Sequence, residues 1–166
     1  MVDRTRPDGV IEPTPPFLLA ALPQRGASAE IGGAFDRLYA WAGPRGLIGP
    51  QTRSIGVYLD DPESVPRAQL RSYAGMTVPP GFAAEGEIEI VEIPGGEVAA
   101  IVHKGPYAEL EAVYRGLYKG WLPQSGREPA DAPPFEEYLN DPRATPPVDW
   151  LTKVCLPLEA QVAARA

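Results

Sequence analysis

The sequence predicts an α+β fold made of two strand–helix–strand–strand units, with two helices on a mostly antiparallel sheet. Three observations indicate this fold. Several short segments alternate apolar and polar residues with the period of a half-buried strand. Two longer segments place apolar residues three to four apart, as amphipathic helices do. The order of these segments also repeats along the 166-residue chain, which is long enough for one domain with a hydrophobic core.

The first unit follows a polar, proline-rich stretch, residues 1–16, that we expect to be a flexible or extended arm. The apolar run 17–22 predicts a buried strand. Ile31, Phe35 and Leu38 share one stripe of residues 29–42. This spacing predicts an amphipathic helix over 29–42, for which Ser28 is the candidate N-cap.

Two strands complete the first unit. Residues 53–59 alternate Ile55, Val57 and Leu59 with smaller or polar residues, and the turn after them begins at Asp60. Residues 70–78 resume extended character before Pro79-Pro80.

The second unit repeats this order. Residues 87–93 and 97–103 alternate as strands around Pro94-Gly95-Gly96, which predicts a β-hairpin. A helix follows, with one stripe made of Leu110, Val113, Tyr114, Leu117 and Trp121. Residues 133–140 and 151–158 predict two more strands.

Internal identities at a nearly constant offset indicate that the unit is duplicated. Matches at an offset of 79 pair Ala20-Ala21 with Ala99-Ala100, Gly26 with Gly105, Leu38-Tyr39 with Leu117-Tyr118, and Pro44 with Pro123. Matches at an offset of 80 pair Tyr58-Leu59 with Tyr138-Leu139, Asp61-Pro62 with Asp141-Pro142, and Pro66 with Pro146. We therefore expect one domain over 17–158, with units at about 17–80 and 87–158, and a tail over 159–166. The seam between such halves is a preferred position for a ligand cleft.

Composition excludes several classes of protein. The net charge is −7, all of it from residues 81–166, which argues against direct binding of a nucleic-acid backbone. The single cysteine, Cys155, excludes an internal disulfide and favours a cytoplasmic location, and no apolar run is long enough to span a membrane. Phosphate-loop, nucleophile-elbow and zinc-ligand motifs are absent, so we expect neither a cofactor nor a metal.

The stretch Phe135-Glu136-Glu137-Tyr138 is the most informative candidate for a binding site. In a strand, Glu136 and Tyr138 share one face, while Phe135 and Glu137 lie on the other. Glu136 corresponds to Gly56 in the first unit, so the repeated fold does not require its carboxylate. A carboxylate beside aromatic rings can bind a cation. The alternative is an exposed glutamate on a solvated strand.

Other candidates divide between site and structure. Tyr58, Tyr114 and Tyr138 are the stronger pocket candidates, because a buried phenol needs a hydrogen-bond partner, whereas a phenol that faces a pocket does not. Trp121, like Trp41, lies near a helix end, where core packing is the alternative. The remaining polar candidates have structural interpretations, as a histidine that bonds the next turn or as Asp-Pro turns: His103, Asp61-Pro62 and Asp141-Pro142.

Four strings of residues resemble the GyrI-like small-molecule-binding family, which includes the effector-binding domains of AraC-type and MerR-type multidrug regulators. They are Ser54-Ile-Gly-Val-Tyr58 followed by Asp60-Asp61-Pro62, His103-Lys-Gly-Pro-Tyr107, Trp121-Leu-Pro-Gln-Ser-Gly126, and Phe135-Glu136-x-Tyr138-Leu-Asn-Asp-Pro142. The resemblance covers about Phe17 to Leu158 and implies the same duplicated fold with a cleft. The short stretch before Phe17 is expected to leave no room for a helix-turn-helix.

The resemblance implies a stand-alone domain that binds bulky hydrophobic or cationic aromatic molecules. The resemblance implies a pocket glutamate, which falls on Glu136, and aromatic rings; we expect the ligand-binding residues to be Glu136, Tyr58, Tyr114, Trp121, Tyr138 and Trp150. An alternative is a hydrolase that opens strained cyclopropane rings of DNA-alkylating natural products, with Glu136 as the catalytic residue that activates water. A further alternative is a modulator of gyrase, although the residues themselves indicate neither gyrase nor a DNA-binding partner.

Overall fold

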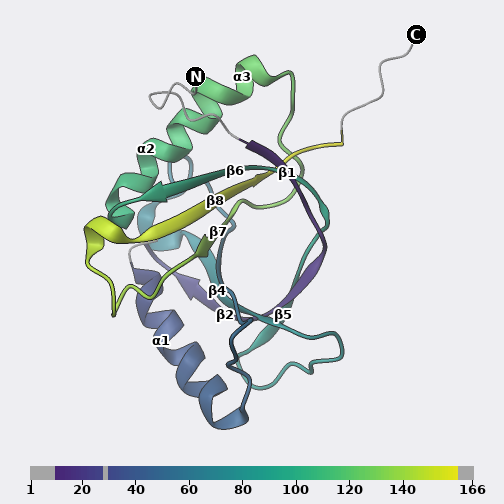
Figure 1. The fold of residues 1–166 in the computed structure, drawn as a ribbon, viewed down its shortest axis with the longest axis vertical. Coiled ribbons are helices and arrows are strands. Elements are labelled where there is room, and N and C mark those ends of the chain that lie inside the picture. The colour runs from purple at the N-terminus through teal and green to yellow at the C-terminus, as the bar shows by residue number, and fades with distance from the viewer. Residues whose placement is uncertain (1–9, 28–29, 161–166) are drawn as a thin grey trace.

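A computed structural model describes residues 10–27 and 30–160 of the chain, and these residues form one curled antiparallel sheet with helices on one face (Figure 1). The eight strands are ordered β1-β6-β8-β7-β3-β4-β2-β5. The α+β class predicted from the sequence is therefore confirmed. The strands are β1 (Val10–Thr14), β2 (Phe17–Arg25), β3 (Ser54–Tyr58), β4 (Arg71–Val78), β5 (Glu89–Ile93), β6 (Gly96–Lys104), β7 (Phe135–Tyr138) and β8 (Leu151–Pro157).

Two helical segments cover the sheet. The first is α1 (Ile31–Ala42), extended by η2 (Gly43–Arg45). The second runs without a break through α2 (Leu110–Arg115), the π-helical turn η5 (Gly116–Trp121) and α3 (Leu122–Ser125). Short 3-10 turns precede β4, α2 and β8, respectively: η3 (Arg67–Gln69), η4 (Tyr107–Glu109) and η6 (Pro147–Asp149).

The sheet curls where two pairs of consecutive strands, β1 with β2 and β5 with β6, each act as one long bent strand. β1 pairs with β6 and β2 pairs with β5 in one continuous antiparallel register, from Val10 opposite Ala100 to Ala21 opposite Glu89. The ladder is interrupted at Pro15-Pro16, which lack N–H donors. Each long strand thus passes from one side of the curl to the other, which Figure 1 shows as two arcs.

The predicted hairpin between residues 87–93 and 97–103 is wrong. β5 pairs with β2, whereas β6 lies between β1 and β8. Pro94-Gly95 bends the chain without reversing it. A side chain at Gly95 would place its Cβ 2.7 Å from Cδ of Pro16, so this glycine permits the two bends to pass each other closely.

The duplication is visible in matched backbone contacts. The amides of Gly26 and Gly105, both at positive φ, donate hydrogen bonds of 2.8 Å to the carbonyls of Leu70 and Trp150. These two acceptors are themselves related by the repeat offset. At the centre of the sheet, β3 and β7 pair with Gly56 opposite Glu136, which are repeat counterparts as well. The pseudo-two-fold axis that relates the halves therefore passes between these two residues.

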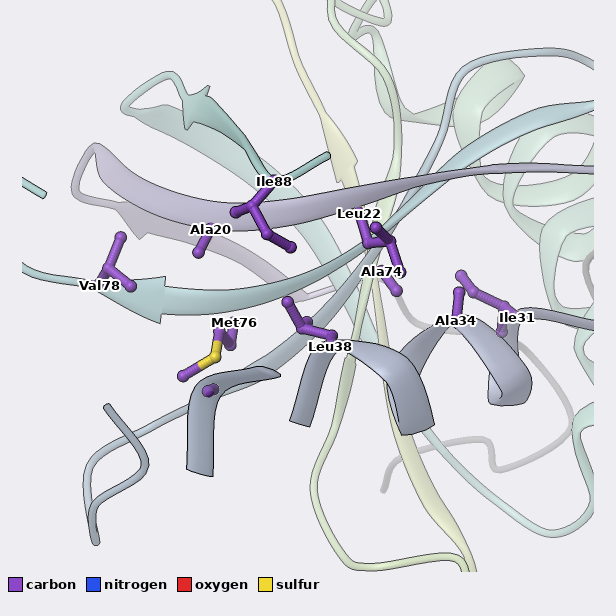
Figure 2. Close-up of a cluster of buried hydrophobic side chains, with 10 residues drawn as sticks. Ala20, Leu22, Ile31, Ala34, Leu38, Ala74, Met76, Val78 and Ile88 are labelled. Atoms are coloured by element: carbon purple, nitrogen blue, oxygen red, sulfur yellow. The ribbon is translucent and has the colours of Figure 1, made fainter. Parts of the chain in front are cut away.

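The core consists of three apolar clusters. One packs α1 against β2 and β4, with Leu38 fully buried at its centre (Figure 2). A second packs the other helical segment against β6 and β8, with Leu117 in the equivalent place. The third fills the opposite, concave face of the sheet and includes Phe135 and Cys155.

The starts of the first helix and of the first strand can be compared with those expected. α1 begins at Ile31 after Glu30, which makes no side-chain cap, and the candidate cap Ser28 lies outside the described residues. Val10–Thr14, within the arm expected to be flexible or extended, is extended and forms a strand paired with β6.

Replacing Leu38 or Leu117 by alanine tests whether the two halves are packed equivalently. Both side chains are 0% exposed, and each truncation leaves a cavity. We expect each variant to lose about 2–5 kcal/mol of unfolding free energy in urea denaturation. Val148→Ala, at a side chain that is 67% exposed, is the control and should change little. A loss in only one of the two leucine variants would contradict the equivalence.

Candidate functional site

The candidate site is centred on the carboxylate of Glu136, at the pseudo-two-fold axis. The side chain is only 4% exposed, and its register partners are Gly56 on β3 and Val154 on β8. Phe135 and Glu137 lie on the opposite face, as strand alternation predicts. Phe135 enters the concave cluster, and Glu137 pairs with Arg53 at 2.8 Å. The alternative of an exposed surface glutamate at position 136 is therefore excluded.

Three tyrosines form a hydrogen-bonded chain with this carboxylate. Tyr114, which projects from α2, donates to Oε2 at 2.6 Å. Tyr138, on the same strand, donates to Oε1 at 3.1 Å. The hydroxyl of Tyr138 also lies 2.5 Å from that of Tyr58, its counterpart in the first half. Each carboxylate oxygen is therefore hydrogen-bonded to a phenol, as a buried anion requires.

Burial and hydrogen bonding act in opposite directions on the pKa of Glu136. Burial raises the pKa above its ordinary value, because it disfavours the charged form. Hydrogen bonds from the phenols of Tyr114, Tyr138 and Tyr58 oppose this rise. Burial and then the Glu136 charge raise the pKa of each of these phenols well above 10, so they act as neutral donors.

Aromatic rings surround the phenol chain. Phe35 from α1 packs edge-on against Tyr138, with ring centroids 5.4 Å apart. Tyr107 from η4 lies 5.5 Å from Tyr138 on centroids and stacks on Trp150 at 4.3 Å. Burial, followed by the charge of Glu136, raises the pKa of Tyr107 to about 12. The site is thus a carboxylate set among rings drawn from both helices and from the loops beside them.

The two halves contribute unequally to this site. Phe35 and Tyr114 occupy equivalent helix positions under the repeat offset, and both lie at the site. The second half therefore provides a phenol and a carboxylate where the first half provides a phenyl ring and a glycine. At Gly56 and Glu136 the asymmetry lies in the side chains, because the two residues occupy equivalent positions in the β3–β7 pairing.

The structure brings together most of the residues expected from the sequence. Tyr58, Tyr114 and Tyr138 form the hydrogen-bonded chain around Glu136, and Trp150 joins the cluster through Tyr107. Trp121 packs, as Tyr107 and Tyr114 also do, on the apolar cluster between the second helical segment and the sheet, and its role in binding stays a prediction.

Sequence reasoning missed Phe35 and Tyr107 as members of the site. Phe35 could have been found as the repeat counterpart of Tyr114. Tyr107 closes the string His103-Lys-Gly-Pro-Tyr107, which was noted only as a family resemblance.

Other candidate features have structural roles. His103 lies 3.0 Å from Glu109 across the Gly105 turn. Asp61 and Asp141 each accept a backbone hydrogen bond of 2.9 Å within their own turns, from the residue two positions later. Within 10–27 and 30–160, no group of three or more His, Cys, Asp or Glu is placed to hold a metal. In the same part of the chain, no helix is long and apolar enough to cross a membrane.

Two hollows lie away from Glu136. One, of about 280 Å³, is bounded by residues between Tyr118 and Glu128. The other, of about 210 Å³, lies between Pro23–Arg25 and Arg71–Tyr73. Neither is lined by Glu136 or by the three tyrosines bonded around it.

The duplicated fold and its central site define a domain of the small-molecule-binding kind. Residues 10–159 match the family described as the GyrI-like small molecule binding domain, and the chain belongs to this family. A protein named DNA gyrase inhibitor from Erwinia billingiae (strain Eb661) is 31% identical over 116 residues, or 64% of this chain and 69% of the relative. The resemblance inferred from the sequence strings is therefore confirmed.

Solved structures share the fold at low sequence identity. The C-terminal domain of EcmrR has a TM-score of 0.74 and 19% identity, covering 90% of this chain and 96% of that domain. In the EcmrR–DNA complex (TM-score 0.77, 18% identity), the match covers 90% of this chain but only 56% of the EcmrR chain. A hydrolase from Listeria innocua has a TM-score of 0.64 and 13% identity, with 93% of each chain covered. SAV2435 bound to tetraphenylphosphonium has a TM-score of 0.59 and 12% identity, covering 90% of this chain and 95% of that one.

Burial of Glu136 makes the stability of the protein depend on pH. Because its pKa is raised in the folded state, its contribution to stability is fully present below the unfolded pKa of about 4.3. That contribution is lost as pH rises through the folded pKa. We expect the unfolding free energy of the wild type to fall over this window relative to that of Glu136→Gln, in denaturation measured at a series of pH values. Parallel pH profiles for the two proteins would contradict a raised pKa.

Proposed function

We propose that this domain binds bulky hydrophobic or cationic aromatic small molecules between α1 and α2, with Glu136 as the anionic partner of the ligand. One observation carries the proposal. Glu136 is a buried carboxylate, and within the described residues no Lys, Arg or His lies within ion-pair distance of it. A buried anion without a counter-ion attracts a cation more strongly than an exposed one does, because water screens it less.

The rings around Glu136 favour an aromatic cation over an inorganic one. The faces of Phe35, Tyr107 and Tyr138 offer apolar area, and each ring face attracts a cation by about 0.5–2 kcal/mol. Burying about 250 Å² of a flat ligand would contribute roughly 6 kcal/mol before ordering costs, consistent with micromolar binding. The structural likeness to a protein bound to tetraphenylphosphonium supports the same ligand class.

Ligand binding to the carboxylate requires some of these side chains to move. Glu136 is 4% exposed, and the phenols of Tyr114 and Tyr138 occupy both of its oxygens. A cation would therefore replace a phenol contact, and its charge would replace the hydrogen bond that is lost.

Titration with tetraphenylphosphonium tests the proposal, because this probe carries charge and aryl surface but no hydrogen-bond donor. We expect micromolar binding to the wild type by calorimetry, and at least about tenfold weaker binding to Glu136→Gln, a loss of roughly 1.4 kcal/mol. Glu137→Gln is the matched control, since this neighbouring carboxylate lies on the opposite face and pairs with Arg53. Equal affinities for wild type and Glu136→Gln would reject the role of the carboxylate.

A second candidate is the opening of a strained cyclopropane ring by water, with Glu136 as general base. The raised pKa of this carboxylate favours it, because a general base works best with a pKa near the operating pH. The likeness to a hydrolase from Listeria innocua also supports it. The substrate would provide its own strain, so no protein nucleophile is needed.

Turnover of an electrophilic cyclopropane, followed by its ultraviolet spectrum, separates this candidate from binding alone. A hydrolase should open the ring in the wild type and lose nearly all of this rate in Glu136→Gln. Binding of the cyclopropane without any rate above that of buffer would leave only the binding function.

The name of the curated relatives supports a third candidate, an interaction with DNA gyrase. Such an interaction would use the surface of the domain, so it would be insensitive to the change Glu136→Gln at a side chain that is 4% exposed.

A further inference from the structure

Gly56 occupies an unusual position for a glycine. It lies in the middle of β3, fully inside the sheet, directly opposite Glu136. Glycine in the interior of a strand is unfavourable, because it orders a flexible residue and adds no side chain to pack. Gly56 is also not among the glycines with positive φ, so its backbone conformation is open to any residue.

The two phenols provide the reason for glycine at this position. A Cβ on residue 56 would lie 2.6 Å from the hydroxyl oxygen of Tyr138 and 3.0 Å from that of Tyr58. The next nearest atom is Cε2 of Tyr138, at 3.3 Å. All three contacts involve the outer ends of side chains, so an added methyl would displace the phenols before it displaced the backbone.

Displacing these phenols would change the surroundings of Glu136. Tyr138 donates to Oε1 of the carboxylate, and Tyr58 bonds to Tyr138. The bond from Tyr114 to Oε2 comes from α2, on the other side of the carboxylate, and does not depend on position 56. A side chain at residue 56 would thus leave one carboxylate oxygen without its donor.

We propose that Gly56 is a positioning residue of the site: its missing side chain leaves room for the hydroxyls of Tyr58 and Tyr138 to meet over β3, so that Tyr138 can hydrogen-bond the carboxylate of Glu136. Glu136 and Gly56 are repeat counterparts, so the absence of a side chain at Gly56 also means that the site has one carboxylate where an exact repeat would place two. A second acidic side chain there would face Glu136 at about 5 Å between Cβ atoms. The selectivity of the site for cationic over neutral ligands follows from this arrangement and rests on the proposed function.

The groups that face Glu136 determine what a pH titration would report. Within the described residues, the titratable groups coupled to Glu136 are all phenols: Tyr58 from β3, Tyr107 from η4, Tyr114 from α2 and Tyr138 from its own strand, β7. Their pKa values all lie above the ordinary tyrosine value, so none titrates near Glu136. A change in the midpoint of Glu136 therefore reports hydrogen bonding to its carboxylate.

The ligand-free test is a carbon-13 NMR titration of the Glu136 carboxyl in Gly56→Ala. We expect its midpoint to rise by about one pH unit relative to the wild type, because loss of the donor favours the protonated form. Gly75→Ala is the matched control. This buried glycine of β4 is also crowded, since an added Cβ would lie 2.9 Å from Cδ1 of Leu19, but the three atoms nearest to that Cβ include neither phenol. It should be destabilised as well, with the Glu136 midpoint unchanged.

A double-mutant comparison separates the phenols from other effects of the added methyl. In the background Tyr58→Phe with Tyr138→Phe, both hydroxyls that crowd position 56 are gone. Adding Gly56→Ala to that background should therefore shift the Glu136 midpoint by less than about 0.3 of a pH unit. Tyr138→Phe alone, which keeps Gly56, should raise the midpoint as Gly56→Ala does.

Three results would overturn the proposal. A folded Gly56→Ala variant with the wild-type midpoint would show that the phenols tolerate a side chain there. An unchanged midpoint in Tyr138→Phe would show that the phenol does not hold the carboxylate. Failure of Gly56→Ala to fold even in the double phenylalanine background would show that the glycine serves the fold. All three are measured without ligand, so they judge Gly56 even if tetraphenylphosphonium does not bind.

Discussion

The burial of one carboxylate at the centre of a duplicated sheet is the constraint on which the rest of the site depends. A charged group in such a place is tolerated only when its oxygens are hydrogen-bonded or when it meets an opposite charge. In this structure, Tyr114 and Tyr138 supply the hydrogen bonds. The proposed ligand would supply the opposite charge. Without ligand, the carboxylate of Glu136 is thus hydrogen-bonded at both oxygens, and it still attracts a cation because it has no ion-pair partner among the described residues.

Duplication explains why the site lies where it does. Two equivalent units pair through β3 and β7, so their symmetry axis falls on the cross-strand pair of Gly56 and Glu136. Side chains from both helices converge on this axis, since Phe35 and Tyr114 occupy equivalent helix positions. The symmetric fold therefore brings side chains of both halves to the axis. Two pairs of equivalent residues differ there: Glu136 and Tyr114 of the second half are polar, whereas Gly56 and Phe35 of the first half are not.

The sequence contained most of the fold and part of the site. Alternation, helical stripes and the nearly constant repeat offset predicted both units and placed Tyr58 with Tyr138, because these signals are local or repeated. The pairing of β5 with β2 was not predictable from the Pro94-Gly95 turn, since it depends on how the sheet curls. The place of Trp121 was not predictable either, because its helical stripe fits both a core and a pocket. In the structure, Trp121 packs on the cluster between its helix and β6 and β8, where Tyr107 and Tyr114 pack as well.

A crystal structure of the protein with a lipophilic aromatic cation such as tetraphenylphosphonium tests the central claim most directly. We expect ligand density against Glu136, between α1 and α2, with at least one of the phenols of Tyr114 and Tyr138 moved away from the carboxylate. Density confined to the hollow near Tyr118 or to that near Arg71, with the phenol chain around Glu136 unchanged, would contradict it.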